Sequence, residues 1–171
     1  MKTKERTSAI VPGTFDPVTK GHIAMIRRAS LLFDEVTVLF AVNGEKNALF
    51  TLEERIAMMR QAICGLPNVK IDTEKGNVGD YCRLHGIDVI FKGLRCTKDY
   101  NYEEEMAQVN HMLAPETETV FWEATGENRH ISSTMIRVFL SAGTDVSPWL
   151  PEGVTLPERI AKQSRKKVGK T

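Results

Sequence analysis

Residues 12–22 read Pro-Gly-Thr-Phe-Asp-Pro-Val-Thr-Lys-Gly-His, and this stretch decides how the rest of the chain is interpreted. It follows a short apolar run at residues 8–11, which is typical of a strand. It opens a segment whose apolar residues recur at helical spacing: Ile23, Ile26, Ala29 and Phe33. The N–H groups of a first helical turn are unpaired and the helix dipole adds partial positive charge, so this strand, loop and helix start predict an anion site. We expect His22 to present a ring nitrogen to the bound anion.

The stretch lacks the Gly-Lys-Ser/Thr ending of a Walker A loop, and it is not the G-x-G-x-x-G dinucleotide fingerprint. Residues 19–22, Thr-Lys-Gly-His, resemble the T/H-x-G-H signature of the nucleotidyltransferase superfamily. The longer string at residues 12–22 resembles the phosphopantetheine adenylyltransferase family. Taken alone, one Gly-His pair between a strand and a helix is also compatible with an ordinary strand-to-helix connection that has no function.

The composition is that of an ordinary globular protein, with 42% hydrophobic and 26% charged residues in a chain of 171. We expect a single domain over residues 1–171. No apolar run approaches the ~20 residues of a membrane helix. The polar N-terminus lacks the apolar region of a signal peptide. These features predict a cytoplasmic protein that does not associate with a membrane.

The cysteines and charges exclude several kinds of site. Cys64, Cys82 and Cys96 are odd in number and form no C-x-x-C, which argues against a disulfide framework or a zinc site. The four scattered histidines predict no protein-built metal site, so a divalent metal would arrive with the phosphates of a substrate. A net charge of +1 gives no broad footprint for nucleic acid. Residues 164–171 are basic. We interpret them as a flexible tail, with contact to RNA or acidic partners as the alternative.

Strand-like and helix-like segments alternate along the chain. Strands are expected at residues 8–11, 35–42, 69–71, 89–91 and 119–122. Further helices are expected from the capping box at 51–54, at 77–85, at 102–113, at 131–142 and from residue 156. This alternation predicts an α/β fold, a Rossmann-like open parallel sheet of about five strands with helices on both faces.

Open parallel sheets bind ligands beyond the carboxyl ends of their strands. Lys46 follows the second expected strand, where the alternative is a solubilising surface lysine. Lys92 and Arg95 flank Gly93 after the fourth strand, an arrangement suited to a polyphosphate or to two phosphate-bearing ligands. The hydroxyls of residues 132–134 open a helix, where they can contact phosphate or serve only as caps.

Further motifs extend the resemblance to the phosphopantetheine adenylyltransferase family from about residue 10 to residue 151. Phe50–Arg55 matches the family's F-T-L-E-E-R, residues 92–95 match R-G-L-R with lysine in place of the first arginine, and residues 131–134 match I-S-S-S/T.

This resemblance implies a set of site residues. His22, Lys46 and Arg95 would be catalytic. The ATP-binding residues would be Thr14, Phe15, His22, Gly93, Leu94, Arg95, Glu103, Asn128, Arg129, His130, Ile131, Ser132, Ser133 and Thr134. The acceptor-binding residues would be Thr14, Lys46, Val78 and Lys92. Glu103 stands beside two more glutamates, so a solvated acidic helix face is its alternative interpretation.

The implied reaction is transfer of AMP from ATP to 4′-phosphopantetheine, giving dephospho-coenzyme A and pyrophosphate, with Mg²⁺ bound through the ATP phosphates. The resemblance also implies a homohexamer and feedback by coenzyme A. Because the chain shows no triad of nucleophile, base and orienting group, we expect direct in-line attack without a covalent enzyme intermediate.

Two other functions share part of the pattern. A cytidylyltransferase or a nicotinamide-mononucleotide adenylyltransferase has the same T/H-x-G-H loop. A non-catalytic nucleotide-sensing module is a further alternative. The combination of His22, Lys46 and Arg95 argues against it, since sensing needs no transition-state donor.

Overall fold

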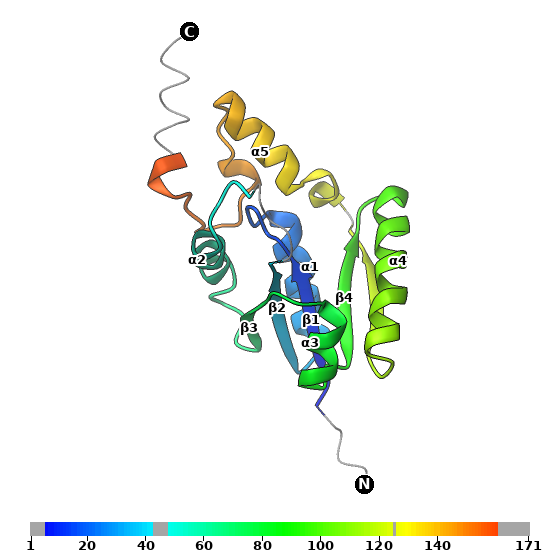
Figure 1. Cartoon of the computed structure of the whole chain (residues 1–171). Helices are drawn as coiled ribbons and strands as arrows, with labels where there is room; N and C mark the ends of the chain where they lie inside the picture. Colours follow the sequence, from blue (N-terminus) through cyan, green and yellow to red (C-terminus); the bar gives the residue numbers. More distant parts are fainter. Residues whose placement is uncertain (1–5, 43–47, 125, 161–171) are drawn as a thin grey trace.

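The five runs expected as strands pair in one parallel sheet, as the sequence predicts (Figure 1). The strands are β1 (Ser8–Gly13), β2 (Glu35–Ala41), β3 (Val69–Glu74), β4 (Val89–Leu94) and β5 (Glu118–Glu123). The computed structural model describes residues 6–42, 48–124 and 126–160, apart from the side chains of residues 98, 127 and 128. Lys46 and the basic tail at 164–171 therefore lie outside the described residues.

The strand order is β3-β2-β1-β4-β5. The chain builds outward from β1 to β3 and then returns to place β4 on the other side of β1. The carboxyl ends of β1 and β4 therefore flank the point where the strand order reverses. In Rossmann-like sheets this switch point is the crevice in which ligands bind.

The helices are α1 (Lys20–Leu32), α2 (Leu52–Ala62), α3 (Val78–His85), α4 (Thr97–Leu113) and α5 (Ser133–Ala142), with 3-10 turns η1 (Gly126–His130) and η2 (Ser147–Trp149). The expected start of the fourth helix, residue 102, is wrong by five residues. Asp99 lies in the first turn of α4 and accepts hydrogen bonds from Arg95, which starts the helix earlier than the polar composition suggests. The last helix begins at residue 158 rather than 156.

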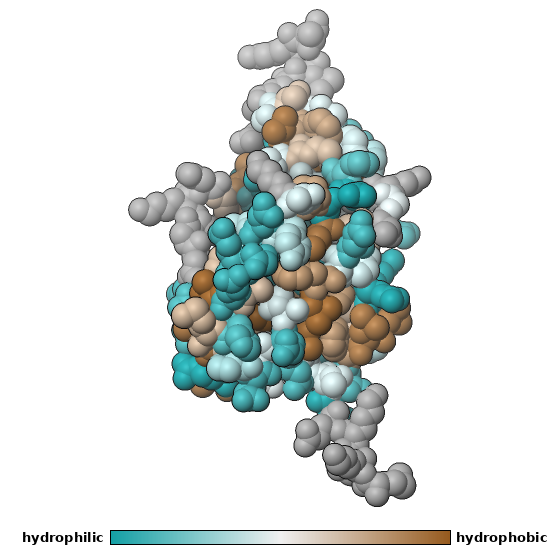
Figure 2. Space-filling view, turned by 90° about the vertical axis from the view of Figure 1, so that its right-hand side faces the viewer, coloured by the Kyte–Doolittle hydropathy of each residue, from teal (hydrophilic) through white to brown (hydrophobic). Residues whose placement is uncertain are grey.

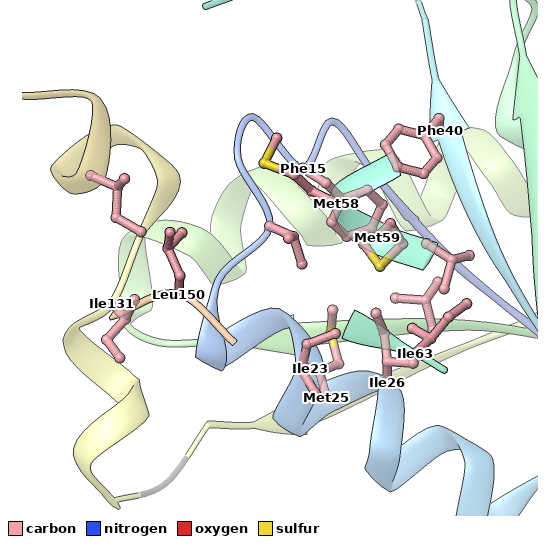
Figure 3. Close-up of a cluster of buried hydrophobic side chains, with 14 of the residues drawn as sticks. Phe15, Ile23, Met25, Ile26, Phe40, Met58, Met59, Ile63, Ile131 and Leu150 are labelled. Atoms are coloured by element: carbon pink, nitrogen blue, oxygen red, sulfur yellow. The ribbon is translucent and has the colours of Figure 1, made fainter. Parts of the chain in front are cut away.

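Helices cover both faces of the sheet, as expected. Side chains alternate between faces along a strand. Val11, Val38 and Phe91 pack into a cluster with buried residues of α1, α2 and α5. Figure 3 shows part of this cluster, including Ile26 of α1 and Met59 of α2. The neighbouring Ile10 and Ile90 pack on the opposite face with α3 and the residue after α4. No described helix has the length and apolar character needed to cross a membrane.

Candidate active site

A cleft of about 730 Å³ lies at the carboxyl ends of β1 and β4. It is lined by the loops after these strands, the starts of α1 and α5, and one side of α4. Most of the residues expected to bind nucleotide or acceptor lie on it: Thr14, Phe15, His22, Lys92, Gly93, Arg95, Glu103, Ile131, Ser132, Ser133 and Thr134. The cleft thus gathers groups from four separate segments at the switch point.

Some expected site residues lie elsewhere. Val78 begins α3 and packs with the apolar cluster on the opposite face of the sheet. Leu94, Arg129 and His130 do not line the cleft, although Arg129 Nε donates to the Arg95 carbonyl at 2.8 Å. Lys46 and the side chain of Asn128 lie outside the described residues. The roles implied for all of these residues stay predictions.

The orientation of His22 is fixed by a capping box at the start of α1. The N–H of His22 donates to Thr19 Oγ1 at 3.2 Å, and the N–H of Thr19 donates to His22 Nδ1 at 3.1 Å. The histidine ring thus takes the place of the usual glutamate or glutamine. Because Nδ1 accepts a hydrogen bond, the proton of the neutral ring resides on Nε2.

The charge state of His22 follows from its surroundings. Burial, with a smaller contribution from the positive charge of Arg95, lowers the pKa of His22 to about 4. The imidazole is therefore neutral near pH 7, and Nε2–H is a neutral hydrogen-bond donor. Such a donor can stabilise negative charge that develops on a phosphate oxygen.

Phe15 supports this ring from the preceding loop. Its own ring meets His22 edge to face, with centroids 5.1 Å apart. The backbone of Phe15 has φ of 50°, in the left-handed region that residues other than glycine rarely adopt. A Cβ on Gly13 would lie 2.8 Å from Phe15 Cζ. Gly13 is therefore needed to make room for the ring that holds His22.

Two cations at the carboxyl end of β4, Lys92 within the strand and Arg95 directly after it, each have a carboxylate partner on α4. Lys92 Nζ lies 2.9 Å from Glu103 Oε2, with both side chains about one-fifth exposed. Arg95 donates through Nε to Asp99 Oδ2 at 2.9 Å and through Nη2 to Oδ1 at 3.2 Å. Asp99 and Glu103 are one helical turn apart, so they share a face of α4. The cations are held in place, and among the described residues none bonds Nη1 of Arg95, which leaves this group to a ligand.

The hydroxyls at the start of α5 are bonded to protein groups. Ser132 Oγ accepts the N–H of Met135 at 3.1 Å, Ser133 Oγ donates to the Pro17 carbonyl at 2.8 Å, and Thr134 Oγ1 accepts from Arg137 Nη2 at 3.1 Å. That these hydroxyls contact ATP stays a prediction. The backbone N–H groups of the first turn are the donors that this helix start offers to a phosphate.

Three further residues shape the site and were not singled out from the sequence: Asp16, Asp99 and Arg137. Arg137 Nη1 donates to the Asp16 carbonyl at 2.6 Å, and its side chain lines the cleft. Arg137 is three residues after Thr134 on the same helix face, a spacing that could have indicated it. Asp99 follows Arg95 by four residues, which is the corresponding signal for that pair.

The described residues include no group of three or more His, Cys, Asp or Glu side chains placed to hold a metal ion. The two carboxylates in the cleft that belong to α4 are each paired with a cation.

Comparison with known proteins agrees with this geometry. The family model described as "Cytidylyltransferase-like" matches residues 10–139. A phosphopantetheine adenylyltransferase from Limosilactobacillus reuteri (strain DSM 20016) is 40% identical over 164 residues, which cover 95% of each chain. One from Heliobacterium modesticaldum (strain ATCC 51547 / Ice1) is 40% identical over 148 residues, covering 86% of this chain and 88% of the relative. The chain belongs to the phosphopantetheine adenylyltransferase family.

The fold extends beyond this family. The structure of a bifunctional NMN adenylyltransferase/ADP ribose pyrophosphatase from Francisella tularensis matches with a TM-score of 0.66 at 14% identity, covering 96% of this chain and 53% of that one. At this identity the match shows a shared fold alone.

Proposed function

We propose that this protein transfers AMP from ATP to 4′-phosphopantetheine, producing dephospho-coenzyme A and pyrophosphate. The proposal rests on the placement of His22. The Thr19 capping box binds Nδ1 and so fixes the ring in a cleft between two helix N-termini, with the neutral Nε2–H as the donor. The membership of the chain in the phosphopantetheine adenylyltransferase family supports the choice of acceptor.

The reaction is a direct displacement at the α-phosphorus. An oxygen of the acceptor's phosphate forms a bond to the α-phosphorus, while the bond to the oxygen that bridges the α- and β-phosphates breaks. Pyrophosphate leaves with that electron pair. The attacking oxygen is already anionic, so no general base is required, and catalysis depends on positioning and charge stabilisation.

The described residues divide this work. His22 donates to the α-phosphate oxygens as their charge increases. Arg95, Arg137 and the N–H groups at the start of α5 stabilise the triphosphate. Lys92 meets the acceptor phosphate by exchanging part of its contact with Glu103. Thr14 lines the same cleft beside His22, and Lys46 is the further acceptor contact that the resemblance implies.

Mg²⁺ enters as part of the MgATP substrate, since the described carboxylates of the cleft are engaged with cations. When bound, the ion neutralises phosphate charge. The protein groups named above then orient the complex.

We further propose three properties that the resemblance implies: a homohexameric assembly, feedback by coenzyme A and a cytoplasmic location. Exposed apolar side chains support the first. Tyr102, Val109 and Met112 of α4 are exposed, at 63%, 44% and 81%. Figure 2, which views the molecule from the right-hand side of Figure 1, where α4 lies, shows brown patches among hydrophilic residues. Such patches are a usual feature of surfaces that pair with another chain.

The test is pyrophosphate release from MgATP with and without phosphopantetheine, with identification of the product by mass. We expect release to depend on phosphopantetheine and to yield dephospho-coenzyme A. CTP in place of ATP, and nicotinamide mononucleotide in place of the acceptor, are the controls. Comparable kcat/KM with CTP would indicate a cytidylyltransferase instead. Nucleotide binding without any turnover would indicate a sensing module.

A further inference from the structure

The loop after β1 is joined to α2 by Arg55, the last residue of the segment that matches F-T-L-E-E-R. Arg55 Nη1 donates to the Thr14 carbonyl at 2.8 Å, across 41 residues of sequence. The arginine carries a charge, yet it is only 3% exposed. Burial of a charge is costly unless the group makes strong hydrogen bonds, and bonds from a charged donor are among the strongest. This bond therefore fixes the direction of the Thr14 carbonyl.

The carbonyl belongs to the peptide that joins Thr14 to Phe15, which is trans. In a trans peptide the carbonyl and the N–H of the next residue point in opposite directions. The Thr14 carbonyl points to α2, and no residue of this helix lines the cleft, whereas Thr14 and Phe15 both line it. The Phe15 N–H therefore points away from α2, to the side on which the cleft opens. Within the described part of the chain, no protein group accepts a hydrogen bond from it.

The observed orientation of this peptide strains the backbone. Phe15 has φ of 50°, and such a conformation persists only where the surrounding structure holds it. Rotation of the Thr14–Phe15 peptide plane by half a turn would bring φ of Phe15 into the ordinary extended region. The same rotation would turn the Thr14 carbonyl oxygen toward the cleft. Arg55 opposes it, because the rotated carbonyl could no longer accept from Nη1.

We propose that Arg55 is a positioning residue for phosphate binding. It holds the Thr14–Phe15 peptide with its N–H toward the cleft, where this group donates to a phosphate oxygen of ATP. The inference rests on the proposed function, in which ATP occupies the cleft. Without Arg55 the strained peptide rotates and presents a carbonyl oxygen, which repels phosphate. Arg55 does not line the cleft, and it acts through Thr14 and Phe15.

Arg55→Met tests the proposal, because it removes the donor with little change in the length of the side chain. Titration calorimetry with tripolyphosphate and with adenosine, both with Mg²⁺, separates the phosphate contact from the rest of the cleft. We expect the Kd for tripolyphosphate to rise about tenfold, while the Kd for adenosine changes less than twofold. Loss of folded protein would lower the number of sites without changing either Kd. A general distortion of the cleft would raise both.

Two control variants separate this effect from the substitution itself and from lost stability. Arg60→Met makes the same change at an exposed residue of the same helix, and it should leave both Kd values unchanged. Asn68 Nδ2 donates to the carbonyls of Ser30 and Phe33 at 2.9 and 3.0 Å, and none of these residues lines the cleft. Asn68→Ala should therefore lower the unfolding midpoint and leave both Kd values unchanged.

Two further substitutions of Arg55 complete the test. Arg55→Lys keeps a charged donor without the planar fork, and it should restore the Kd for tripolyphosphate to within about threefold of the wild type. Arg55→Gln, whose side chain is shorter and neutral, replaces Arg55→Met if that variant does not fold, with the same expected result. An unchanged Kd for tripolyphosphate in these donor-deficient variants would overturn the inference, as would equal increases for both ligands. Failure of the wild-type protein to form dephospho-coenzyme A would instead refute the proposed function, and the titrations would still decide the role of Arg55.

Discussion

At the amino edge of the sheet, side-chain hydrogen bonds join the segments that enter neighbouring strands, whereas at the carboxyl edge they join loops and helix starts. Asp34 accepts from Thr7, just before β1, and Asp88 accepts from Ser8, the first residue of β1. Thr117 Oγ1 donates to the Ile87 carbonyl at 2.8 Å, just before β4. At the other edge, Ser133 makes a bond of the same kind between two segments that border the cleft, and Asp16 joins the loop before α1 to the segment that enters α2.

The two edges differ in which hydrogen-bond donors remain after these bonds are made. At the carboxyl edge, His22 is held through Nδ1 and keeps Nε2–H, and Arg95 is held through Nε and Nη2 and keeps Nη1. One side of each group is used for positioning and the other faces the cleft. Substitutions at the carboxyl edge should therefore affect turnover, and those at the amino edge should affect stability.

The largest effect is expected for His22→Ala. Loss of one transition-state donor lowers kcat by about 10²–10³, while the KM for ATP changes little. Steady-state kinetics measure this. His111→Ala, on the exposed last turn of α4, is the matched control and should be silent. A kcat near the wild-type value in His22→Ala would remove the main support for the mechanism.

The next effect concerns Lys92, which stands where the family has arginine. Lys92→Ala should raise the KM for phosphopantetheine roughly ten- to a hundredfold and leave the KM for ATP nearly unchanged, because a charged hydrogen bond to the acceptor phosphate is lost. Lys92→Arg should preserve activity.

Removal of Lys92 also leaves Glu103 without its ion-pair partner. The double variant Lys92→Ala, Glu103→Gln separates that cost from loss of the phosphate contact, and its acceptor KM should stay high. Lys70→Ala, which breaks the exposed pair with Glu35, is the control and should leave both KM values unchanged. An unchanged acceptor KM in Lys92→Ala would show that the role implied for this position is wrong.

A smaller effect is expected from Ser133→Ala, which removes the bond to the Pro17 carbonyl in the loop before α1. One hydrogen bond of about 1 kcal/mol corresponds to roughly a fivefold lower kcat if it serves positioning. A lowered unfolding midpoint with normal kcat would show that this bond contributes to stability alone, as is expected of the bonds at the amino edge.

Much of the fold could be predicted from the sequence because its rules are local. The capping box of Thr51 and Glu54 forms as expected, with both bonds present. Gly86 and Gly143 end their helices in the left-handed conformation, at φ of 61° and 80°. The location of the cleft could also be predicted, since the carboxyl ends of parallel strands share one edge of the sheet.

What the sequence did not indicate depends on contacts across the fold. Asp16 lies in the diagnostic string, but its partners are 33 and 34 residues away and carry no side-chain signal, because they are backbone N–H groups. The hydroxyls of residues 132–134 could be expected at the cleft, but not their bonds to the protein. A histidine in a capping box is also outside the usual S/T-x-x-E pattern.

The pH dependence should be small. The pKa of His22 is lowered to about 4 in the folded protein, against an ordinary value of 6.5. Protonation of this ring therefore contributes no step in kcat between pH 6 and 8. Between about pH 6.5 and 4 the unfolded state binds more protons at this site, so its contribution to stability falls as the pH is lowered through that window. An NMR titration of the His22 ring with a midpoint near 6.5 would contradict this.

The smallest effect on activity is expected from Thr117→Val, the counterpart of Ser133→Ala at the amino edge. Both hydroxyls donate to a backbone carbonyl at 2.8 Å, but Thr117 is only 4% exposed and joins the segments before β4 and β5. Valine has nearly the same shape, so the substitution removes the bond without creating a cavity. A loss of about 1–2 kcal/mol should lower the Tm by roughly 2–8 °C for a domain of this size. Because no group of the cleft depends on this bond, kcat and both KM values should equal those of the wild type at a temperature well below the transition. Calorimetry and steady-state kinetics on the two variants together decide the comparison. A lower kcat in Thr117→Val at full folding would show that the amino edge also positions the site.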